Sequence, residues 1–286
     1  RTMKLIRFGN PGQEKPGVVI DNKRYDVSQL VRDFDEDFFT GNGIDNLKAA
    51  LDKNPSLPEV TAEVRWASSV SKPPKIVCIG LNYADHAAES NMAAPAEPVV
   101  FFKATTALCG PNDDVMIPRN SVKTDWEVEL SVVIGKKASY VEEAEAMDYV
   151  AGYCLHNDYS EREFQLERGG QWVKGKSCDT FAPLGPWIAT KDEVKDVNNL
   201  RLWLSVNGKM MQDGNTSNLI FKVPFLVHYL SQFMTLLPGD VISTGTPAGV
   251  GLGQKPNPVY IKAGDVMELG IDGLGTSKQT AVAWKK

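Results

Sequence analysis

The sequence predicts a mainly β fold with a few peripheral helices, of the α+β class. Short apolar segments of strand length, bounded by turn residues, recur from residue 3 to residue 284. Few segments have the 3.6-residue apolar period of a helix, and strands do not alternate regularly with helices as they do in a parallel sheet. The chain has no internal repeat. These observations together favour a β-rich roll or sandwich.

Length and composition are those of an ordinary soluble protein. The 286 residues are enough for one large domain, or for one domain and a smaller one. The net charge of -5 argues against nucleic acid or an anionic membrane as the main partner. No apolar run approaches the ~20 residues that span a bilayer, and no secretory signal is visible, so we expect a cytoplasmic protein. The cysteines form no Cys-x-x-Cys pair, which is typical of reduced thiols: Cys78, Cys109, Cys154 and Cys178.

Residues 1–70 are expected to form a small N-terminal domain. Apolar segments bounded by turns predict strands at Met3–Phe8, Gly17–Ile20 and Arg24–Val27. A helix is predicted at Asp45–Lys53, closed by Asn54 and Pro55. The stretch Ser68–Pro74 ends in two prolines and has the composition of a linker. We therefore place a boundary near residue 70, with a second domain over residues 71–286.

The second domain is predicted to consist mainly of strands. They are expected at Lys75–Gly80, Pro98–Lys103, Asp125–Gly135, Tyr149–Leu155, Val241–Thr244, Val266–Ile271 and Ala281–Trp284. The pair Asn207-Gly208 predicts a hairpin that joins Leu200–Val206 to Lys209–Gln212. Helices are expected after Asn82 as the N-cap residue, and at Glu142–Met147, Ser160–Glu167 and Val223–Leu236.

The segment Asp125–Gly135 contains the first candidate site. In a strand, Glu127 and Glu129 point to one face and the apolar row that begins with Trp126 and Val128 points to the other. Two carboxylates at this spacing repel each other unless a cation compensates them, and a hard divalent cation prefers oxygen ligands. The competing interpretation is the solvent-facing side of an edge strand. The strand alone does not decide between the two.

The three histidines have different neighbours. His86 and Glu89 are three residues apart on a predicted helix and so share one face. Such a pair is more often part of a surface helix than of a catalytic site. His156 lies two residues before Asp158 on the same strand face, in a position to orient it. His228 lies in an apolar helix and is most simply a packed residue.

Two glycine-rich stretches imitate nucleotide-binding motifs. Residues 170–177 match the P-loop pattern and place Lys176 at the lysine position, but charged residues precede them and prolines follow. A P-loop follows a buried strand and opens a helix, so this context is missing. Residues 249–253 resemble part of a dinucleotide fingerprint, but Pro256 and Pro258 follow instead of a helix. A P-loop nucleotide-binding protein remains the alternative from another functional class.

Six segments, in order, resemble the fumarylacetoacetate hydrolase family over about residues 73–284. They are Gly80–Glu89, Pro98–Lys103, Asp125–Leu130, Asn157–Glu163, Trp172–Lys176 and Pro238–Gly251. The resemblance implies the mixed β-sandwich roll of that family, usually as a homodimer. Residues 1–70 then correspond to the small N-terminal domain that many members have.

The resemblance also assigns roles to residues. It implies that Glu127, Glu129 and Asp158 are ligands of Mg²⁺ or Mn²⁺, and that His86 and Glu89 activate water from a lid over the substrate. The groups around the carboxylate and keto oxygens of the substrate are then Arg162, Gln165, Lys176 and Thr246. The ammonium of Lys176 would also offset negative charge as it develops during the reaction. One departure is the segment between Asp158 and Lys176, which is shorter than in the acylpyruvase members and bears most on Gln165.

The implied activity is metal-dependent hydrolysis of a carbon–carbon bond in a 2,4-diketo acid, that is, an acylpyruvate. Its products are pyruvate and a carboxylic acid. The N-terminal module and the opening residues 3–9 look most like members that act on 2,4-diketo-3-deoxy-L-rhamnonate or -fuconate and release lactate. Decarboxylation of oxaloacetate is the alternative within the family, and a catalytically silent, metal-stabilised dimer is a third. The sequence does not choose the diketo acid or decide between Mg²⁺ and Mn²⁺.

Overall fold

The computed structural model describes residues 2–286 and confirms a mainly β chain with few helices. Its strands are β1 (Lys4–Phe8), β2 (Lys15–Ile20), β3 (Lys23–Asp26), β4 (Glu59–Val60), β5 (Trp66–Ala67), β6 (Ile76–Gly80), β7 (Val99–Lys103), β8 (Leu108–Cys109), β9 (Val115–Met116), β10 (Thr124–Asp125), β11 (Val128–Ile134), β12 (Val150–Asn157), β13 (Ser160–Glu161), β14 (Ala182–Pro183), β15 (Ile188–Thr190), β16 (Arg201–Val206), β17 (Lys209–Asn215), β18 (Val241–Ser243), β19 (Val266–Ile271) and β20 (Gly275–Val282). Its α-helices are α1 (Glu36–Thr40), α2 (Gly43–Asp52), α3 (Ala84–Glu89), α4 (Arg162–Leu166), α5 (Val173–Lys176) and α6 (Val223–Leu230). Short 3₁₀ turns are η1 (Thr105–Ala107), η2 (Glu143–Tyr149), η3 (Lys191–Glu193), η4 (Thr216–Asn218) and η5 (Gly251–Gly253).

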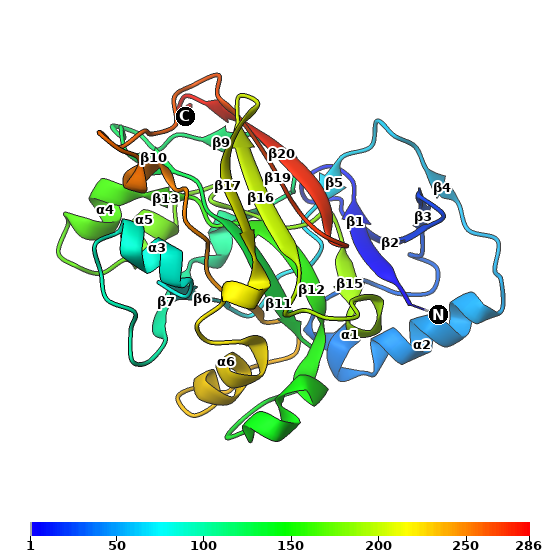
Figure 1. The fold of residues 1–286 in the computed structure, drawn as a ribbon. Coiled ribbons are helices and arrows are strands. Elements are labelled where there is room, and N and C mark those ends of the chain that lie inside the picture. The colour runs from blue at the N-terminus through cyan, green and yellow to red at the C-terminus, as the bar shows by residue number, and fades with distance from the viewer. Residues whose placement is uncertain (1) are drawn as a thin grey trace.

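Two large sheets face each other and enclose the main core. The larger has eleven strands in the order β4-β3-β2-β1-β15-β12-β11-β18-β6-β7, with β5 beside β1. The smaller has five strands in the order β17-β16-β19-β20-β9, and its strands β16 and β19 pack across β11 (Figure 1). The core between the sheets includes branched aliphatic side chains such as Leu130, Val132, Leu204 and Leu269, which alternate with other residues along their strands.

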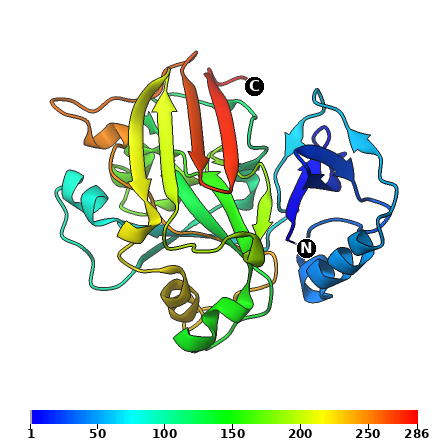
Figure 2. The same cartoon turned by 45° about the vertical axis from the view of Figure 1, so that its right-hand side comes forward.

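The N-terminal strands and helices α1 and α2 lie beside this sandwich (Figure 2). Strand β1 pairs with β15 through Lys4–Ala189 and Leu5–Ile188, so the N-terminal strands extend the larger sheet. A second core cluster joins Phe34 and Leu47 to Ile188 and other side chains of the sandwich. The domain boundary near residue 70 stays a prediction.

Strand β11 lies inside the larger sheet, between β12 and β18, and all seven of its residues are buried. The interpretation of this segment as an edge strand with a solvent-facing side is therefore wrong. The predicted single strand over Asp125–Gly135 is also interrupted, because Trp126 and Glu127 separate β10 from β11.

Several predicted helix ends differ from the structure. Helix α3 begins at Ala84 with Tyr83 at its cap, so the N-cap prediction for Asn82 is wrong. The Asn82 amide instead accepts a hydrogen bond from Phe221 N and donates one to Thr244 O, at 2.8 Å each. These tertiary partners occupy the groups that a cap would use.

Three other segments differ in length or type. The helix predicted to Leu236 ends at Leu230. Further along the chain, Leu236 N donates to Ala138 O at 2.9 Å and not to a carbonyl one helical turn before it. The helix predicted at Glu142–Met147 is the 3₁₀ turn η2, and helix α1 was not predicted. The last strand runs over Gly275–Val282 instead of Ala281–Trp284. Within residues 2–286, no helix combines the length and apolarity that crossing a membrane requires.

Candidate functional site

Three carboxylates meet inside the sandwich. One oxygen of each of Glu127, Glu129 and Asp158 lies within 4.8 Å of the others, a spacing that a single metal ion spans. All three side chains are buried, with exposed fractions of 5%, 1% and 0%. Buried carboxylates at this spacing need compensating positive charge.

Strand pairing places these carboxylates together. Antiparallel β11 and β12 pair in a register that sets Val128 opposite Asn157 and Glu129 opposite His156. The next residue after β12 is Asp158, whose amide donates to Glu127 O at 2.9 Å. Residues far apart in the sequence therefore meet at the short interruption between the β11–β12 pair and the β10–β13 pair.

Three buried cations surround two of the carboxylates. Lys176 Nζ lies 3.0 Å from Asp158 Oδ2 and 3.3 Å from Glu127 Oε1, and it donates to Ser160 Oγ at 2.7 Å. Lys103 Nζ donates to the other Asp158 oxygen and to Tyr159 O. Arg162 Nη2 lies 2.9 Å from Glu127 Oε2.

The charges determine how these groups ionise. Burial opposes ionisation of Asp158, but Lys103 and Lys176 outweigh it and hold the pKa of that carboxyl well below its usual range. Burial also opposes ionisation of Glu127, and Lys176 and Arg162 again lower its pKa. Glu129 differs, because burial and the charges of Asp158 and Glu127 raise its pKa well above the ordinary value.

Glu129 shows that the site fits a metal ion. Its Oε1 accepts hydrogen bonds from Ser243 Oγ at 2.7 Å and Gly245 N at 3.0 Å, whereas its Oε2 is buried and has no hydrogen-bond partner. No Lys or Arg among residues 2–286 forms an ion pair with this carboxylate. A divalent cation held by Glu127, Glu129 and Asp158 would satisfy the bare oxygen and supply the missing charge.

His86 and Glu89 form a hydrogen-bonded pair. His86 Nδ1 lies 2.9 Å from Glu89 Oε1, and both side chains are largely buried at 10% and 15% exposure. The second Glu89 oxygen accepts from Gly249 N at 2.9 Å. Because a carboxylate bound at Nδ1 selects the tautomer with the proton on that atom, Nε2 presents a lone pair that can accept a proton.

One cavity of about 240 Å³ brings most of the predicted residues together, but its lining does not include Glu129 or Asp158. Its lining includes the residues His86, Glu89, Glu127, Arg162, Gln165, Lys176 and Thr246. The Gln165 carbonyl oxygen accepts from Arg162 Nη1 at 3.0 Å, which leaves the amide nitrogen of Gln165 for another partner. The Thr246 hydroxyl donates to Val128 O and accepts from Gln212 Nε2. The roles of these residues toward a substrate stay predictions.

The structure also shows site residues that the sequence reasoning did not assign. Lys103 ends an apolar strand, where a lysine is ordinarily exposed, and no local signal points to its partner Asp158, which is 55 residues away. Phe101 and Trp172 form an aromatic wall with ring centroids 5.3 Å apart, and Lys176 Nζ lies 4.8 Å from the Phe101 ring centroid. Asp125 is buried behind Arg162 and accepts from its Nε at 2.9 Å.

The ring of His156 has a different hydrogen-bond partner from the one predicted for it. Its Nδ1 lies 2.8 Å from Ser243 Oγ, and no hydrogen bond joins its ring to Asp158 within residues 2–286. Burial lowers the pKa of His156 to about 3, so its ring is neutral near pH 7. It supports Glu129 through Ser243 rather than orienting Asp158 directly.

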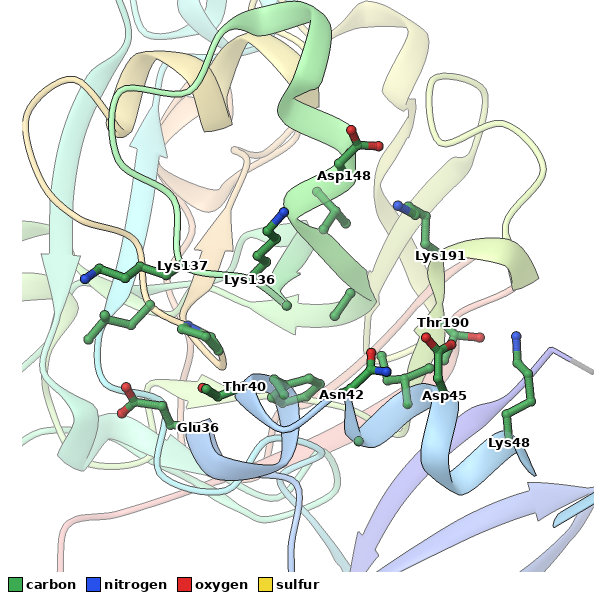
Figure 3. A pocket seen from close by; sticks show the side chains of 18 of the residues that line it. Glu36, Thr40, Asn42, Asp45, Lys48, Lys136, Lys137, Asp148, Thr190 and Lys191 are labelled. Carbon is green, nitrogen blue, oxygen red and sulfur yellow. The ribbon is translucent and has the colours of Figure 1, made fainter. Parts of the chain in front are cut away.

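A larger cavity, of about 880 Å³, lies between the N-terminal helices and the sandwich (Figure 3). It contains none of the predicted site residues. Two of its lysines already have partners, since Lys48 pairs with Asp192 at 3.0 Å and Lys191 donates to Met147 O at 2.8 Å. The smaller cavity, with its buried charges, is the better candidate for chemistry.

The P-loop pattern does not form a phosphate-binding loop here. Helix α4, and not a strand, precedes Gly170, and the short helix α5 lies within the pattern instead of after it. Lys176 is buried against the carboxylates of Glu127 and Asp158, which would repel a phosphate.

Comparison with known proteins agrees with this geometry. Residues 75–282 match the family model described as fumarylacetoacetate (FAA) hydrolase C-terminal. A Burkholderia multivorans protein named "Putative hydrolase" is 56% identical over 278 residues, which cover 97% of this chain and 98% of that protein.

Two solved structures share the whole fold. The fumarylacetoacetate hydrolase of Exiguobacterium antarcticum is 34% identical with a TM-score of 0.86, covering 99% of this chain and 100% of that one. The maleylpyruvate hydrolase of Sphingobium sp. SYK-6, in complex with manganese(II) and pyruvate, is 31% identical with a TM-score of 0.82 at the same coverage. The chain therefore belongs to the fumarylacetoacetate hydrolase family.

Proposed function

We propose that this enzyme hydrolyses the carbon–carbon bond of an acylpyruvate, a 2,4-diketo acid, to pyruvate and a carboxylic acid. One observation carries the proposal. The hydrogen-bonded pair His86–Glu89 and the carboxylate Glu127 of the three-carboxylate cluster line the same cavity. A base that can activate water thus lies beside groups that can bind a divalent cation.

The base acts through His86 Nε2, which takes a proton from water while Glu89 stabilises the charge on the ring. The resulting hydroxide adds to the C4 carbonyl carbon of the substrate. The bond between C3 and C4 then breaks, its electron pair stays on C3, and a proton returned to C3 completes pyruvate. The acyl fragment leaves as the carboxylic acid that contains the oxygen atom of the water.

Arg162 and Lys176 provide fixed positive charge for the substrate carboxylate and keto oxygens. Both are buried and held by Asp125, Glu127 and Asp158, so they need little reorganisation when negative charge develops. A divalent cation at Glu127, Glu129 and Asp158 supplies, when bound, Lewis-acid stabilisation of that charge. The manganese(II) ion in the maleylpyruvate hydrolase complex supports Mg²⁺ or Mn²⁺ as the cofactor.

The size of the cavity limits the substrate class. About 240 Å³ is below the range of ~300–1,000 Å³ that is typical for drug-sized ligands, so a small acyl group fits best. Within this class we propose 2,4-diketo-3-deoxy-L-rhamnonate or -fuconate, with lactate as the second product. This finer assignment rests on the likeness of the N-terminal module to family members that act on those sugar acids.

Oxaloacetate decarboxylation is the second candidate, because the same cation site could serve it. It requires no attacking water, so the close contact between His86 and Glu89 favours hydrolysis. A catalytically silent, metal-stabilised dimer is the third candidate, and it predicts no turnover of any diketo acid.

A substrate panel tests the proposal. The purified protein, with Mg²⁺ or Mn²⁺, is incubated with short acylpyruvates, diketo-deoxy sugar acids and oxaloacetate, and pyruvate and the second product are quantified. We expect pyruvate and a carboxylic acid in equal amounts from at least one diketo acid. Release of carbon dioxide from oxaloacetate alone, or isomerisation without cleavage, would contradict it.

We further propose that the protein acts as a homodimer in the cytoplasm with a small diketo acid as its partner. Sedimentation velocity at micromolar concentration tests the oligomeric state. A mass of one chain at all concentrations would contradict the dimer.

A further inference from the structure

A glycine loop over residues 249–253 lies against Glu89. Gly249 N donates to Glu89 Oε2 at 2.9 Å. At Gly253 a Cβ atom would lie 2.6 Å from the same Glu89 oxygen, so the loop backbone touches this carboxylate at two points. The position of the loop therefore determines where Glu89, and with it His86, can lie.

Asp125 also binds this loop, through other amides than Glu89 does. Its Oδ1 accepts from Gly251 N at 2.7 Å and from Trp126 N at 2.8 Å. Its Oδ2 accepts from Leu252 N at 2.9 Å and from Arg162 Nε at 2.9 Å. The side chain is fully buried, and two of its four donors belong to residues that line the site cavity, Leu252 and Arg162.

We propose that Asp125 is a positioning residue. It fixes the general base His86 with its partner Glu89, and the substrate-binding Arg162, in their positions relative to each other. The inference rests on the proposed function. Its chemical reason is that one carboxylate binds both the glycine loop, through Gly251 N and Leu252 N, and the guanidinium of Arg162. A carboxylate accepts four such donors because it has two equivalent oxygens, whereas an amide offers one.

The substitution Asp125→Asn tests the proposal because it keeps the shape and removes one acceptor oxygen. Either orientation of the amide turns an NH₂ group toward two of the four donors. Its matched control is Asp113→Asn, since Asp113 also accepts from an arginine and a backbone amide, but these partners, Arg65 and Gly110, do not line the site cavity.

With the diketo acid found in the panel, we expect Asp125→Asn to lower kcat by at least about tenfold, yet less than the ~10²–10⁴-fold loss expected on removal of a general base. KM should rise as well, because Arg162 loses its support. In a Glu89→Gln background the effect on kcat should nearly vanish while the effect on KM remains, since members of one unit fail together. If the double mutant loses kcat by the product of the two single-mutant factors, the proposal is overturned.

A readout without turnover separates this inference from the proposed function. Hydrogen exchange should become faster in residues 249–253 and also in residues 84–89 of Asp125→Asn, and in neither segment of Asp113→Asn. Faster exchange in the loop alone would overturn the link to Glu89. If wild type and control both lack acylpyruvate turnover, the proposed function fails, whereas the exchange result still tests Asp125.

A second variant covers a failure of Asp125→Asn to fold. Gly253→Ala leaves Asp125 intact and pushes a methyl group toward Glu89. We expect a lower kcat with an unchanged KM, because Arg162 keeps its partner. Unchanged kcat in Gly253→Ala would overturn the proposal that the glycine loop positions the base.

Discussion

Replacing Lys103 by methionine should lower the melting temperature of the metal-free protein. Lys103 is 2% exposed, and its ammonium contacts one oxygen of Asp158 and the Tyr159 carbonyl. Methionine has nearly the same length but no charge, so it leaves a buried carboxylate with one cation fewer.

The size of the effect follows from what remains around Asp158. Breaking a buried ion pair by removing one partner costs about 3–5 kcal/mol. Since Lys176 stays 3.0 Å from the other oxygen of Asp158, the lower end, about 3 kcal/mol, is expected. At ~2 °C per kcal/mol for a chain of this length, the melting temperature should fall by about 6 °C.

Differential scanning fluorimetry in EDTA and in Mg²⁺ measures the melting temperatures of wild type and Lys103→Met. Mg²⁺ should stabilise Lys103→Met more than wild type, because it replaces the charge that Asp158 lost. The control is Lys48→Met, which breaks a partly exposed pair with Asp192 and should cost under ~1 kcal/mol. If Lys103→Met melts with wild type in EDTA, Lys103 does not stabilise an ionised Asp158 and the reasoning about this charge cluster is refuted.

Three further predictions concern the base, the metal ligands and the nucleotide motif. His86→Ala should lower kcat for hydrolysis by ~10²–10⁴-fold, with Mg²⁺ affinity unchanged in calorimetry. Glu89→Gln should lower kcat less, and the effects of the two substitutions should not add in the double mutant. Full hydrolase activity in His86→Ala would exclude the pair as the base. Because the pKa of Glu129 is raised, a metal that binds below that pKa must displace a proton from its carboxyl, so Mg²⁺ affinity should rise as pH rises through that pKa. The raised pKa also means that protonated Glu129 stabilises the metal-free fold fully below the ordinary carboxyl pKa, and that this stability is lost as pH rises through the raised pKa. Unchanged Mg²⁺ affinity in Glu129→Ala, or no proton release on Mg²⁺ binding in calorimetry with two buffers, would contradict the site. ATP should not bind at micromolar concentration, and binding that is lost in Lys176→Ala would revive the P-loop alternative.

The parts of the site that lie close together in the sequence were predictable. The spacing of Glu127 and Glu129 in an apolar strand, and of His86 and Glu89 in a helix, each follows from the period of one element. Their geometry in the structure agrees with those periods, since the first pair shares the carboxylate cluster and the second is hydrogen-bonded.

The parts that depend on contacts between distant segments were not predictable. Nothing local pairs Lys103 with Asp158 or joins Asp125 to the glycine loop, because these contacts depend on the register and packing of several strands. Asn82 illustrates the same limit of local rules. It precedes a helix and has the right side chain for a cap, but Phe221 and Thr244 bind its amide instead.

The central claim, hydrolysis of a carbon–carbon bond by activated water, is tested most directly by oxygen labelling. The Mg²⁺-loaded enzyme is incubated with its diketo acid in ¹⁸O-labelled water, and the carboxylic acid product is analysed by mass spectrometry. The mechanism through His86 and Glu89 predicts one ¹⁸O atom in the new carboxyl group of the acyl fragment, and a loss of this product in His86→Ala. Product without the label, or carbon dioxide in place of the second acid, would contradict it.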